Sequence, residues 1–503
     1  MQKKYFYVTT PIYYPSGNLH IGHAYTTTLA DILSRYKKIQ NFETFFLTGS
    51  DEHGQKIEKK AIEMQLSPQE YVDKVTANFK ILWEKLNIDY SKFIRTTDIQ
   101  HIDAVKKIFT NLYNKDLIYK GQYDGIYCVT CEEFLTSSQI SSEGFCIISG
   151  DKPQLIKEDT YFLRVSKFQE FLTELLKTNF LIPESRRKEM LKNFIEPGLE
   201  DLSVTRITLE WGIPINEDLK HVIYVWLDAL SNYITALGYN SSDDSLFKKF
   251  WSNDAEIVQL VGKEITRFHS IYWPVILKSL DLRLPDKLLS HGWILFKNAK
   301  MSKSLGNVIN PLDLIEKFES DTLRFYIAHE LPTNRDGNYS EDLIIESYNT
   351  HLANNFGNLA SRVSNMIIKY FDGELIDTNF DNSEIFKFAN ETIDKFQTLM
   401  NNYDISEAVH TALLLGQHCN KIIEEIKPWN LFDKKKYDEL KNFLAAIRYC
   451  ITAMTLMLKP ILVNKIKLFA QQFGYEQEKI DFSNLNTIKF EKITDKLIIF
   501  KRI

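Results

Sequence analysis

Short apolar runs alternate with amphipathic stretches along the first part of the chain. The runs at residues 5–10 and 43–49 predict buried parallel strands, and the apolar spacing over residues 24–39 predicts a helix between them. Residues 116–222 break this alternation, and a core strand predicted at residues 256–262 marks its return. The pattern therefore predicts an α/β fold, with a Rossmann-type parallel sheet and an inserted connective domain.

The last part of the chain has a different pattern. From residue 348 to about residue 472 the apolar spacing stays helical, and few glycines or prolines interrupt it. This spacing predicts a C-terminal α-helical bundle. In the segment before it, Asn310 followed by Pro311 predicts the cap and first residue of a helix.

A turn rich in proline joins the first predicted strand to the first predicted helix. His20 and His23 are three residues apart, so at a helix start they share one face. Unpaired N–H groups and the positive end of the helix dipole make such a site suitable for phosphate. Gly22 has no side chain and lets a flat ring approach the backbone. Taken alone, a His-x-x-His pair more often bonds to a neighbouring loop.

A second motif follows much later in the chain. Lys300 and Lys303 alternate with Met301, Ser302 and Ser304 in a loop before another helix. Cations on a loop neutralise the charge of a triphosphate. Taken alone, this loop is more simply a solvated basic turn.

Composition sets limits on these interpretations. A chain of 503 residues with 44% hydrophobic content predicts two to four domains with sizeable cores. The net charge of −5 gives no global basic field, so nucleic acid would have to meet local patches. Five cysteines make no disulfide framework, and no signal peptide or membrane-length apolar run is visible. We therefore expect a cytoplasmic protein that does not bind membranes.

The histidine and lysine motifs together resemble the paired signatures of the class I aminoacyl-tRNA synthetases, in the same order and without substitution. The sequences Val-Trp-Leu-Asp-Ala, from Val225, and Phe-His-Ser-Ile-Tyr-Trp-Pro, from Phe268, are similar to the methionyl branch of that family. The similarity extends from about residue 4 to the last helices. It implies that the chain activates methionine with ATP to methionyl-adenylate and transfers the methionyl group to tRNA(Met).

The resemblance also implies residue roles in the activation step. It assigns catalytic roles to His20, His23, Lys300 and Lys303. It assigns ATP binding to His20, Gly22, His23, Gly262, Glu264, His291, Ile294 and Lys303. We expect Mg²⁺ to arrive with the ATP phosphates, because this ion seldom needs a cage made only of protein ligands.

A methionine pocket is implied by the same resemblance. Its members are Ile12, Tyr14, Asp51, Trp226, Ala229, Leu230, Tyr233, Ile265, Phe268, His269 and Trp273. Aromatic edges with few polar tips suit a thioether, and Asp51 would bind the substrate's α-amino group. Asp51 could instead cap the helix that begins near Gln55, and the aromatic residues could be ordinary core. Leu230 departs from the family, which often has proline there.

Cysteines in the insertion form an incomplete zinc knuckle. Cys128, Cys131 and Cys146 are three of the four thiols that such a site normally needs, and Ser149 stands in the fourth position. The family often binds zinc here, so Zn²⁺ is possible. The alternative is a knuckle that packing alone holds together. Cys419 and Cys450 fall in helical apolar patterns and are expected in the core.

The helical region carries the residues that match the family's anticodon readers, namely Asn358, Arg362 and Trp429. Arginine and asparagine bond base edges, and tryptophan stacks on an unpaired base. Without the resemblance, a helix-surface pair and a core tryptophan would be the simpler explanations. The chain ends soon after the bundle, and we expect a monomer.

These inferences predict five segments. They are a first half of the catalytic domain (1–115), a connective insertion with the knuckle (116–222), a second catalytic half (223–300), the lysine loop with a stem-contact connector (301–350), and an anticodon-binding domain (351–503). The alternatives are a non-catalytic synthetase-like tRNA-binding paralogue and a small-molecule nucleotidyltransferase. Paralogues of the first kind typically lose the histidines or lysines, and the second kind has no use for a bundle.

Overall fold

The computed structural model describes two compact units, which are treated separately below. The described residues are 4–128, 133–135, 139–147, 149–224, 226–296, 299–300, 308–381, 383–494 and 496–503, without the side chains of 133, 134, 156, 299 and 300. The first unit comprises Met1–Asn18, Phe45–Lys80 and Tyr90–Ser290, and the second comprises Leu19–Thr44, Ile81–Asp89 and His291–Ile503. This division cuts across the five predicted segments, whose boundaries stay a prediction.

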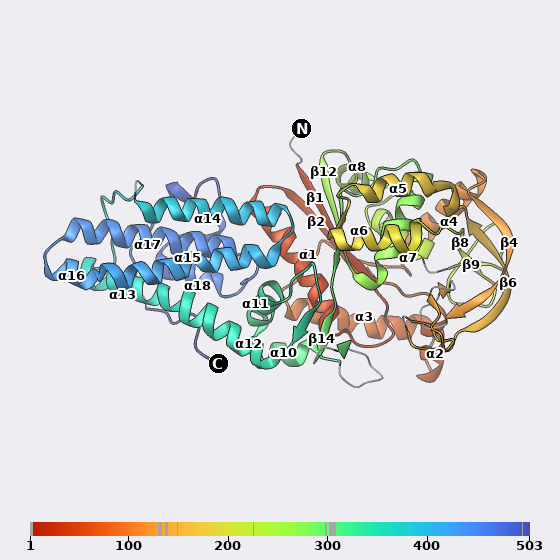
Figure 1. The fold of residues 1–503 in the computed structure, drawn as a ribbon, viewed down its shortest axis with the longest axis horizontal. Helices are drawn as coiled ribbons and strands as arrows, with labels where there is room; N and C mark the ends of the chain where they lie inside the picture. Colours follow the sequence, from red (N-terminus) through yellow and green to blue (C-terminus); the bar gives the residue numbers. More distant parts are fainter. Residues whose placement is uncertain are drawn as a thin grey trace. The chain divides into compact units, whose positions relative to one another are not determined.

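A six-stranded sheet forms the centre of the first unit, and only the ends of two of its strands belong to the second (Figure 1). In spatial order the strands are β3 (Lys92–Arg95), β2 (Glu43–Ser50), β1 (Tyr5–Tyr13), β12 (Ala255–Gly262), β13 (Lys287–His291) and β7 (Leu181–Ile182). β1 runs parallel to β12, with Val8 opposite Val258, and β2 runs parallel to β3. The predicted α/β fold is confirmed.

Apolar residues on both faces of this sheet explain its burial. Tyr7, Leu47, Ile257 and Val261 are completely buried, because helices on either side exclude water from a parallel sheet. These helices include α4 (Ile99–Asn114), α7 (Trp226–Thr235), α8 (Ser245–Phe250) and α9 (Trp273–Ser279). Buried residues of α2 (Gln55–Glu63) and α3 (Pro68–Lys85) form a separate apolar cluster. Short helical segments η4 (Lys263–Ile265) and η5 (Phe268–Tyr272) lead from β12 into α9.

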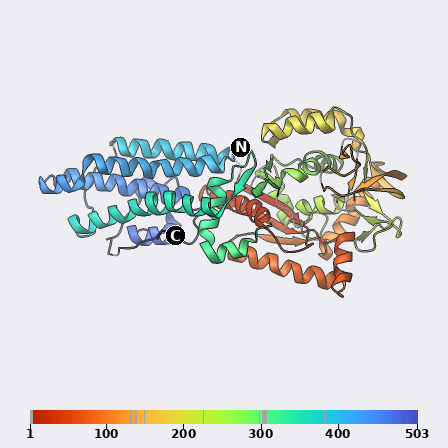
Figure 2. The same cartoon turned by 60° about the horizontal axis from the view of Figure 1, so that its bottom comes forward.

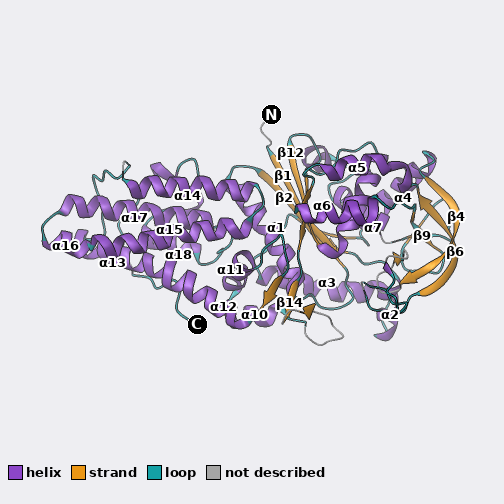
Figure 3. Cartoon of the chain, viewed as in Figure 1, coloured by secondary structure: helices purple, strands orange, loops and turns teal. Residues whose placement is uncertain are grey.

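Antiparallel strands replace the alternation where the sequence predicted an insertion (Figure 3). A four-stranded sheet contains β5 (Glu133–Phe134), β4 (Ile118–Cys128), β6 (Gln154–Leu163) and β8 (Leu202–Ser203). A smaller sheet contains β10 (Ile213–Pro214), β11 (Val222–Ile223) and β9 (Thr205–Arg206), and helices α5 (Gln169–Lys177) and α6 (Glu184–Met190) lie between β6 and β8 in sequence.

The second unit is mainly helical (Figure 2). It begins with α1 (Ile21–Ile39) and continues with α10 (Pro311–Phe318), α11 (Ser320–Glu330) and α12 (Glu341–Ser347), beside a small sheet of β15 (Ala299–Lys300), β14 (Ile294–Phe296) and β16 (Gly337–Tyr339). A π-helical segment, η7 (Tyr348–Gly357), leads into α13 (Asn358–Phe371), α14 (Glu384–Asn401), α15 (Ile405–Ile426), α16 (Pro428–Asp433), α17 (Tyr437–Leu458) and α18 (Ile466–Phe473). The predicted C-terminal bundle is confirmed.

Several local predictions also hold in this unit. The Asn310 side chain accepts a hydrogen bond from the Leu312 N–H and caps α10, with Pro311 as its first residue. Cys419 and Cys450 are completely buried between bundle helices. In the part of the chain that the structure describes, no helix is both long enough and apolar enough to cross a membrane.

Candidate active site

The two histidines of the first motif cap helix α1 in the second unit. The Gly22 N–H donates to Nδ1 of His20 at 3.1 Å, and the His20 N–H donates to Nδ1 of His23 at 2.9 Å. The ring centroids are 3.9 Å apart. The side chains therefore do share a face at the helix start, and they satisfy two backbone donors that the helix leaves unpaired.

This capping determines which ring nitrogen carries the proton. Nδ1 of each neutral ring accepts an N–H, so the proton is on Nε2, from which an N–H can be donated to an anionic oxygen. Gly22 is needed for the arrangement, because a Cβ there would lie 2.9 Å from Cε1 of His20. The ring over this glycine is thus the ring of His20 itself.

His291 and Ile294 lie near α1 in the same unit. Nδ1 of His291 lies 2.8 Å from the Gly292 carbonyl, which can only accept, so Nδ1 carries the proton. Its Nε2 then accepts from the Thr26 hydroxyl at 2.7 Å. Thr26 is on α1, one turn after Gly22, and sequence analysis did not identify it.

The carboxyl ends of two strands carry the polar candidates of the first unit. Asp51 follows β2, where its N–H donates to the Tyr13 carbonyl at the end of β1. Asp51 does not cap α2, whose N-cap is Gly54. Glu264 is exposed just after β12, and its carboxylate lies over Gly262, where a Cβ would be 2.5 Å from Oε1.

Helix α7 and the segment from η4 to α9 bring the predicted aromatic residues together. The rings of Trp226 and Phe268 stack with centroids 3.6 Å apart and planes 9° apart. The Tyr233 hydroxyl donates to Nε2 of His269 at 2.7 Å, and the ring of Trp273 lies 5.6 Å from that of Tyr233. Trp273 is completely buried and serves as core for this cluster.

His269 is neutral in this cluster. Its Nδ1 lies 3.0 Å from the Ile265 carbonyl and therefore carries the proton, which leaves Nε2 to accept from Tyr233. Burial lowers the pKa of His269 to about 4. Burial also raises the pKa of Tyr233, and the nearby charge of Asp51 adds to the increase. The cluster is therefore polar but uncharged at Tyr233 and His269.

The other predicted pocket residues lie around this cluster or beside it. Ile12, Leu230 and Ile265 belong to the same apolar core, and Ala229 is buried on α7. Tyr14 packs in a different cluster, with Ile57 and Tyr71.

A buried carboxylate that sequence analysis missed connects two of these elements. Asp228 on α7 lies 2.7 Å from Nδ1 of His53 and 2.7 Å from Nε2 of His101. Burial opposes its ionisation, but the two histidines lower the pKa of Asp228 to about 2. His53 comes two residues after Asp51, so this network attaches the Asp51 loop to the helix that carries Trp226 and Tyr233. No local sequence pattern predicts this network, because its three members come from separate segments of the chain.

The lysine motif lies mostly outside the described residues. The backbone of Lys300 belongs to β15, and Lys303 is outside the described part. In the knuckle, Cys131 is likewise outside it. Cys128 and Cys146 are both buried in one small cluster with Leu135, and Sγ of Cys128 lies 3.2 Å from Oγ of Ser149.

The predicted anticodon residues lie on α13 and α16. Asn358 is exposed, and the guanidinium of Arg362 pairs with Glu424 of α15 at 2.6 Å. Trp429, in the first turn of α16, is 38% exposed, so it is not a core tryptophan. Lys427 before it has a φ of 54°, which turns the chain sharply between α15 and α16.

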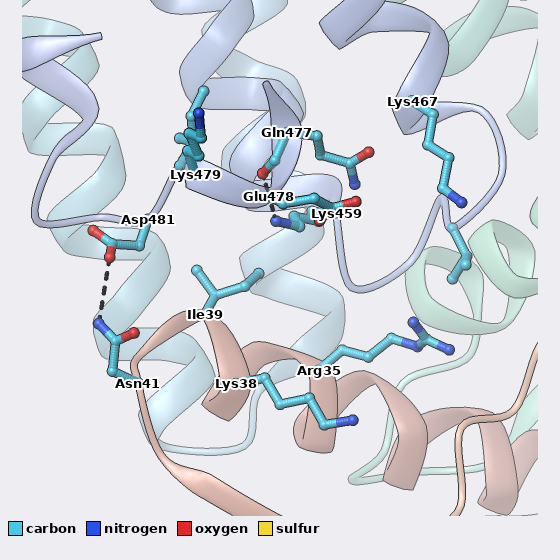
Figure 4. Close-up of a pocket in the computed structure, with 12 residues that line it drawn as sticks. Arg35, Lys38, Ile39, Asn41, Lys459, Lys467, Gln477, Glu478, Lys479 and Asp481 are labelled. Atoms are coloured by element: carbon cyan, nitrogen blue, oxygen red, sulfur yellow. Dashed lines mark hydrogen bonds between the residues drawn. The ribbon is translucent and has the colours of Figure 1, made fainter. Parts of the chain in front are cut away.

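A basic pocket of about 420 Å³ lies at the opposite end of α1 from the histidine pair (Figure 4). Its lining includes five cations, Arg35, Lys38, Lys459, Lys467 and Lys479, and two carboxylates, Glu478 and Asp481. Asn41 donates to Asp481 across its edge at 3.3 Å. Most of α1, a helix of 19 residues or about 28 Å, separates it from His20, so this pocket is not the predicted nucleotide site.

Comparisons with known proteins agree with the motifs. The family model "tRNA synthetases class I (M)" matches residues 6–144 and 142–364. The methionine–tRNA ligase of Enterococcus faecalis is 45% identical and covers 97% of this chain and 75% of its own length. That of Ureaplasma parvum is 44% identical and covers 100% of this chain and 99% of its own length.

A solved structure is also similar. Methionyl-tRNA synthetase of Mycobacterium tuberculosis in complex with methionyl-adenylate has a TM-score of 0.94 and 30% identity, over 99% of this chain and all of that chain. The apo form of the same enzyme gives a TM-score of 0.87. The chain therefore belongs to the class I tRNA synthetases specific for methionine, the methionine–tRNA ligases, as the two motifs and the sequences from Val225 and Phe268 together predicted.

Proposed function

We propose that the residues matched by the two motifs carry out methionine activation in this chain. In the family's reaction, the methionine carboxylate attacks the α-phosphorus of ATP, pyrophosphate leaves, and methionyl-adenylate then esterifies tRNA(Met). Such phosphoryl chemistry depends on positioning and charge stabilisation more than on covalent catalysis. The observation that carries the proposal is that Nδ1 of both His20 and His23 accepts a backbone N–H, which leaves Nε2 as the donor, at the positive end of α1.

On the nucleotide, each group would have a defined task. The Nε2–H groups of His20 and His23 would donate to phosphate oxygens, and Lys303, with Lys300, would neutralise the leaving pyrophosphate. Glu264 would accept from the ribose hydroxyls. His291 and the backbone of Ile294 would lie beside the adenine. Gly22 and Gly262 would leave room for the His20 ring and the Glu264 carboxylate to bind the nucleotide. Mg²⁺ would accompany the phosphates.

On the amino acid, the cluster of Trp226, Tyr233, His269 and Phe268 would hold the side chain. The hydrogen-bonded Tyr233–His269 pair is neutral. It therefore offers polar atoms to the sulfur without burying a charge that an uncharged thioether could not balance. Asp51 would bind the α-ammonium group. The His53–Asp228–His101 network would keep Asp51 and α7 in position.

Three further assignments are also proposals. Zn²⁺ would be held by the thiolates of Cys128, Cys131 and Cys146, a donor set that suits a structural ion although a fourth thiol is absent. Asn358, Arg362 and Trp429 would read the anticodon, with Arg362 exchanging Glu424 for a base. We also expect the protein to be cytoplasmic and monomeric. Light scattering at several protein concentrations would test the monomeric state.

ATP–pyrophosphate exchange with each amino acid in turn tests the proposal. We expect exchange with methionine and loss of exchange in His20→Asn and Lys303→Ala, with methionine affinity preserved in both. Thr110→Ala, a substitution on the surface of α4, serves as the control variant. Exchange of normal turnover in His20→Asn, or only a raised KM for methionine, would remove the histidine from the nucleotide site.

A further inference from the structure

Two histidines and a glutamate meet in the second unit, away from every residue assigned above. His329 and Glu330 are the last residues of α11, and His351 is in the first turn of η7. One possible ligand atom from each residue lies within 4.8 Å of those of the other two. The His329 and His351 rings have centroids 4.5 Å apart. Neither motif, nor the predicted knuckle, includes these positions.

The burial and bonding of the three side chains are unusual for a surface ion pair. His329 and Glu330 are only 10% and 20% exposed, and Nδ1 of His329 lies 2.7 Å from Oε1 of Glu330. The Ser347 hydroxyl lies 3.4 Å from the same nitrogen. Nδ1 of His351 is buried and has no hydrogen-bond partner among the described residues. A buried imidazole nitrogen without a partner is costly, and a bound cation would remove that cost.

The three side chains offer the donor atoms that transition metals take. Each imidazole offers one ring nitrogen and Glu330 offers a carboxylate oxygen. The nitrogen that lacks a partner among the described residues, Nδ1 of His351, is one of the two ring nitrogens that could coordinate an ion.

We propose that His329, Glu330 and His351 bind one divalent transition-metal ion of the zinc type. Two imidazole nitrogens with one carboxylate oxygen suit Zn²⁺, Co²⁺ or Ni²⁺, whereas Mg²⁺ and Ca²⁺ favour sites made of oxygen. Tetrahedral bonds of about 2.0–2.2 Å place ligand atoms about 3.3 Å apart, so small side-chain rotations complete the site from the separations observed. Water takes the fourth position.

The ion stabilises the junction at which the bundle begins. It links the end of α11 to η7 across residues 331–350, and the Ser406 hydroxyl of α15 donates to the His329 carbonyl on the other side. His410 of α15 is close to the three proposed ligands, with its ring centroid 6.3 Å from that of His329. Because the folded state alone presents the three ligands together, binding stabilises this junction in proportion to the free metal.

Cobalt spectroscopy on the full chain tests the proposal and separates this site from the cysteine knuckle. The protein is stripped with a chelator and titrated with Co²⁺. An ion held by nitrogen and oxygen shows visible ligand-field bands alone, whereas thiolate ligands add intense charge-transfer absorption in the near ultraviolet. We expect ligand-field bands without charge transfer for one ion per chain, and a Kd at least about 100-fold higher in Glu330→Gln and His351→Ala.

The controls make each result decisive. His418→Ala removes another histidine from α15, whose ring packs 4.0 Å from that of Phe388, and it should leave Co²⁺ binding unchanged. Zn²⁺ should raise the Tm of the His418→Ala variant as it does that of the natural chain, and less in Glu330→Gln. Glu330→Gln preserves size and hydrogen bonding, so a folded variant with normal Co²⁺ affinity would overturn the proposal. So would Co²⁺ spectra that carry thiolate absorption only.

Discussion

At the scale of residues, hydrogen bonds fix which ring nitrogen carries the proton in the histidines of the proposed site. His20 and His23 accept at Nδ1 and are left to donate from Nε2, whereas His269 donates from Nδ1 to a carbonyl and accepts at Nε2. In the proposed site, the same type of side chain would thus bind a phosphate in one place and a thioether in another. Backbone groups make this choice, because a carbonyl can only accept and an N–H can only donate.

A first prediction concerns the acidity of His269. Its pKa is about 4 in the folded chain against about 6.5 unfolded, so between these values only the unfolded chain binds the proton. The contribution of His269 to the free energy of unfolding is therefore complete above pH 6.5 and declines as the pH falls towards 4. Between pH 7.5 and pH 5, the free energy of unfolding of the natural chain should therefore fall by about 2 kcal/mol more than that of the His269→Gln variant.

Denaturant unfolding of both proteins at the two pH values measures this difference. All other titrating groups are common to the two chains and cancel in the comparison. If the free energy of unfolding falls equally in both, His269 does not titrate as described.

A second prediction concerns the hydroxyl of Tyr233. Tyr233→Phe leaves Nε2 of His269 without its donor, and the loss of one buried hydrogen bond of about 1.5 kcal/mol should raise the Kd for methionine about tenfold. Tyr7→Phe is the matched control, because the Tyr7 hydroxyl donates to the Tyr233 carbonyl and not to His269. Fluorescence titration would compare them, and equal affinities in both variants would place methionine elsewhere.

At the scale of elements, one buried charge cluster fastens four segments of the second unit. The guanidinium of Arg324 on α11 is completely buried, and it donates to Asp31 of α1 at 2.6 Å. It also donates to the Pro460 and Ile461 carbonyls after α17 and to the Leu86 carbonyl after α3. The helix that begins with the histidine pair is thereby fixed in its middle to the helical bundle.

A third prediction tests this cluster. Arg324→Met leaves the Asp31 carboxylate buried without its main partner and should lower the free energy of unfolding by about 3–5 kcal/mol. Arg35 also bonds Asp31, at 2.7 Å, but its side chain is 22% exposed. Arg35→Met should therefore cost only about 1 kcal/mol. Urea unfolding of the two variants gives the comparison, and similar losses would show that burial does not distinguish the two pairs.

At the scale of the whole molecule, the proposed methionine pocket and the proposed anticodon residues lie on different parts of the chain. The aromatic cluster belongs to the first unit, and the proposed anticodon residues belong to the second. Within the second unit, α15 has 22 residues and is about 33 Å long. Ser406 contacts α11 at one end of α15, and Trp429 follows the other end. A substitution at Trp429 should therefore leave the start of α15 undisturbed.

A fourth prediction follows from this separation. Trp429→Ala should leave methionine-dependent ATP–pyrophosphate exchange unchanged and raise the KM for tRNA(Met) by about tenfold or more, because base stacking contributes about 1–3 kcal/mol. Leu414→Ala is the control variant, because it removes an exposed apolar side chain from α15, and it should change neither quantity. Normal charging by Trp429→Ala would contradict the anticodon assignment, and loss of exchange would indicate a general effect on folding.

The sequence by itself determined the elements and the family. Periodicity placed β1, α1, β2 and β12 close to their observed bounds, because apolar spacing reflects which face of an element is buried. The two motifs and the sequences from Val225 and Phe268 then sufficed for the methionine–tRNA ligases. They could not predict that Trp226 stacks on Phe268 or that Tyr233 bonds His269, because such contacts depend on how two helices face each other.

Only the tertiary structure decided how distant polar residues combine. Asp228 joins His53 and His101 from 175 and 127 positions away, and Arg324 meets Asp31 across 293 positions. His329 and His351 approach each other because η7 packs against α11, which no local pattern encodes. The spacing of apolar residues reflects which face of an element is buried. The partner of a charge or hydrogen-bonding group depends instead on which distant segments the fold brings together, so the buried networks and the proposed metal site are visible only in the tertiary structure.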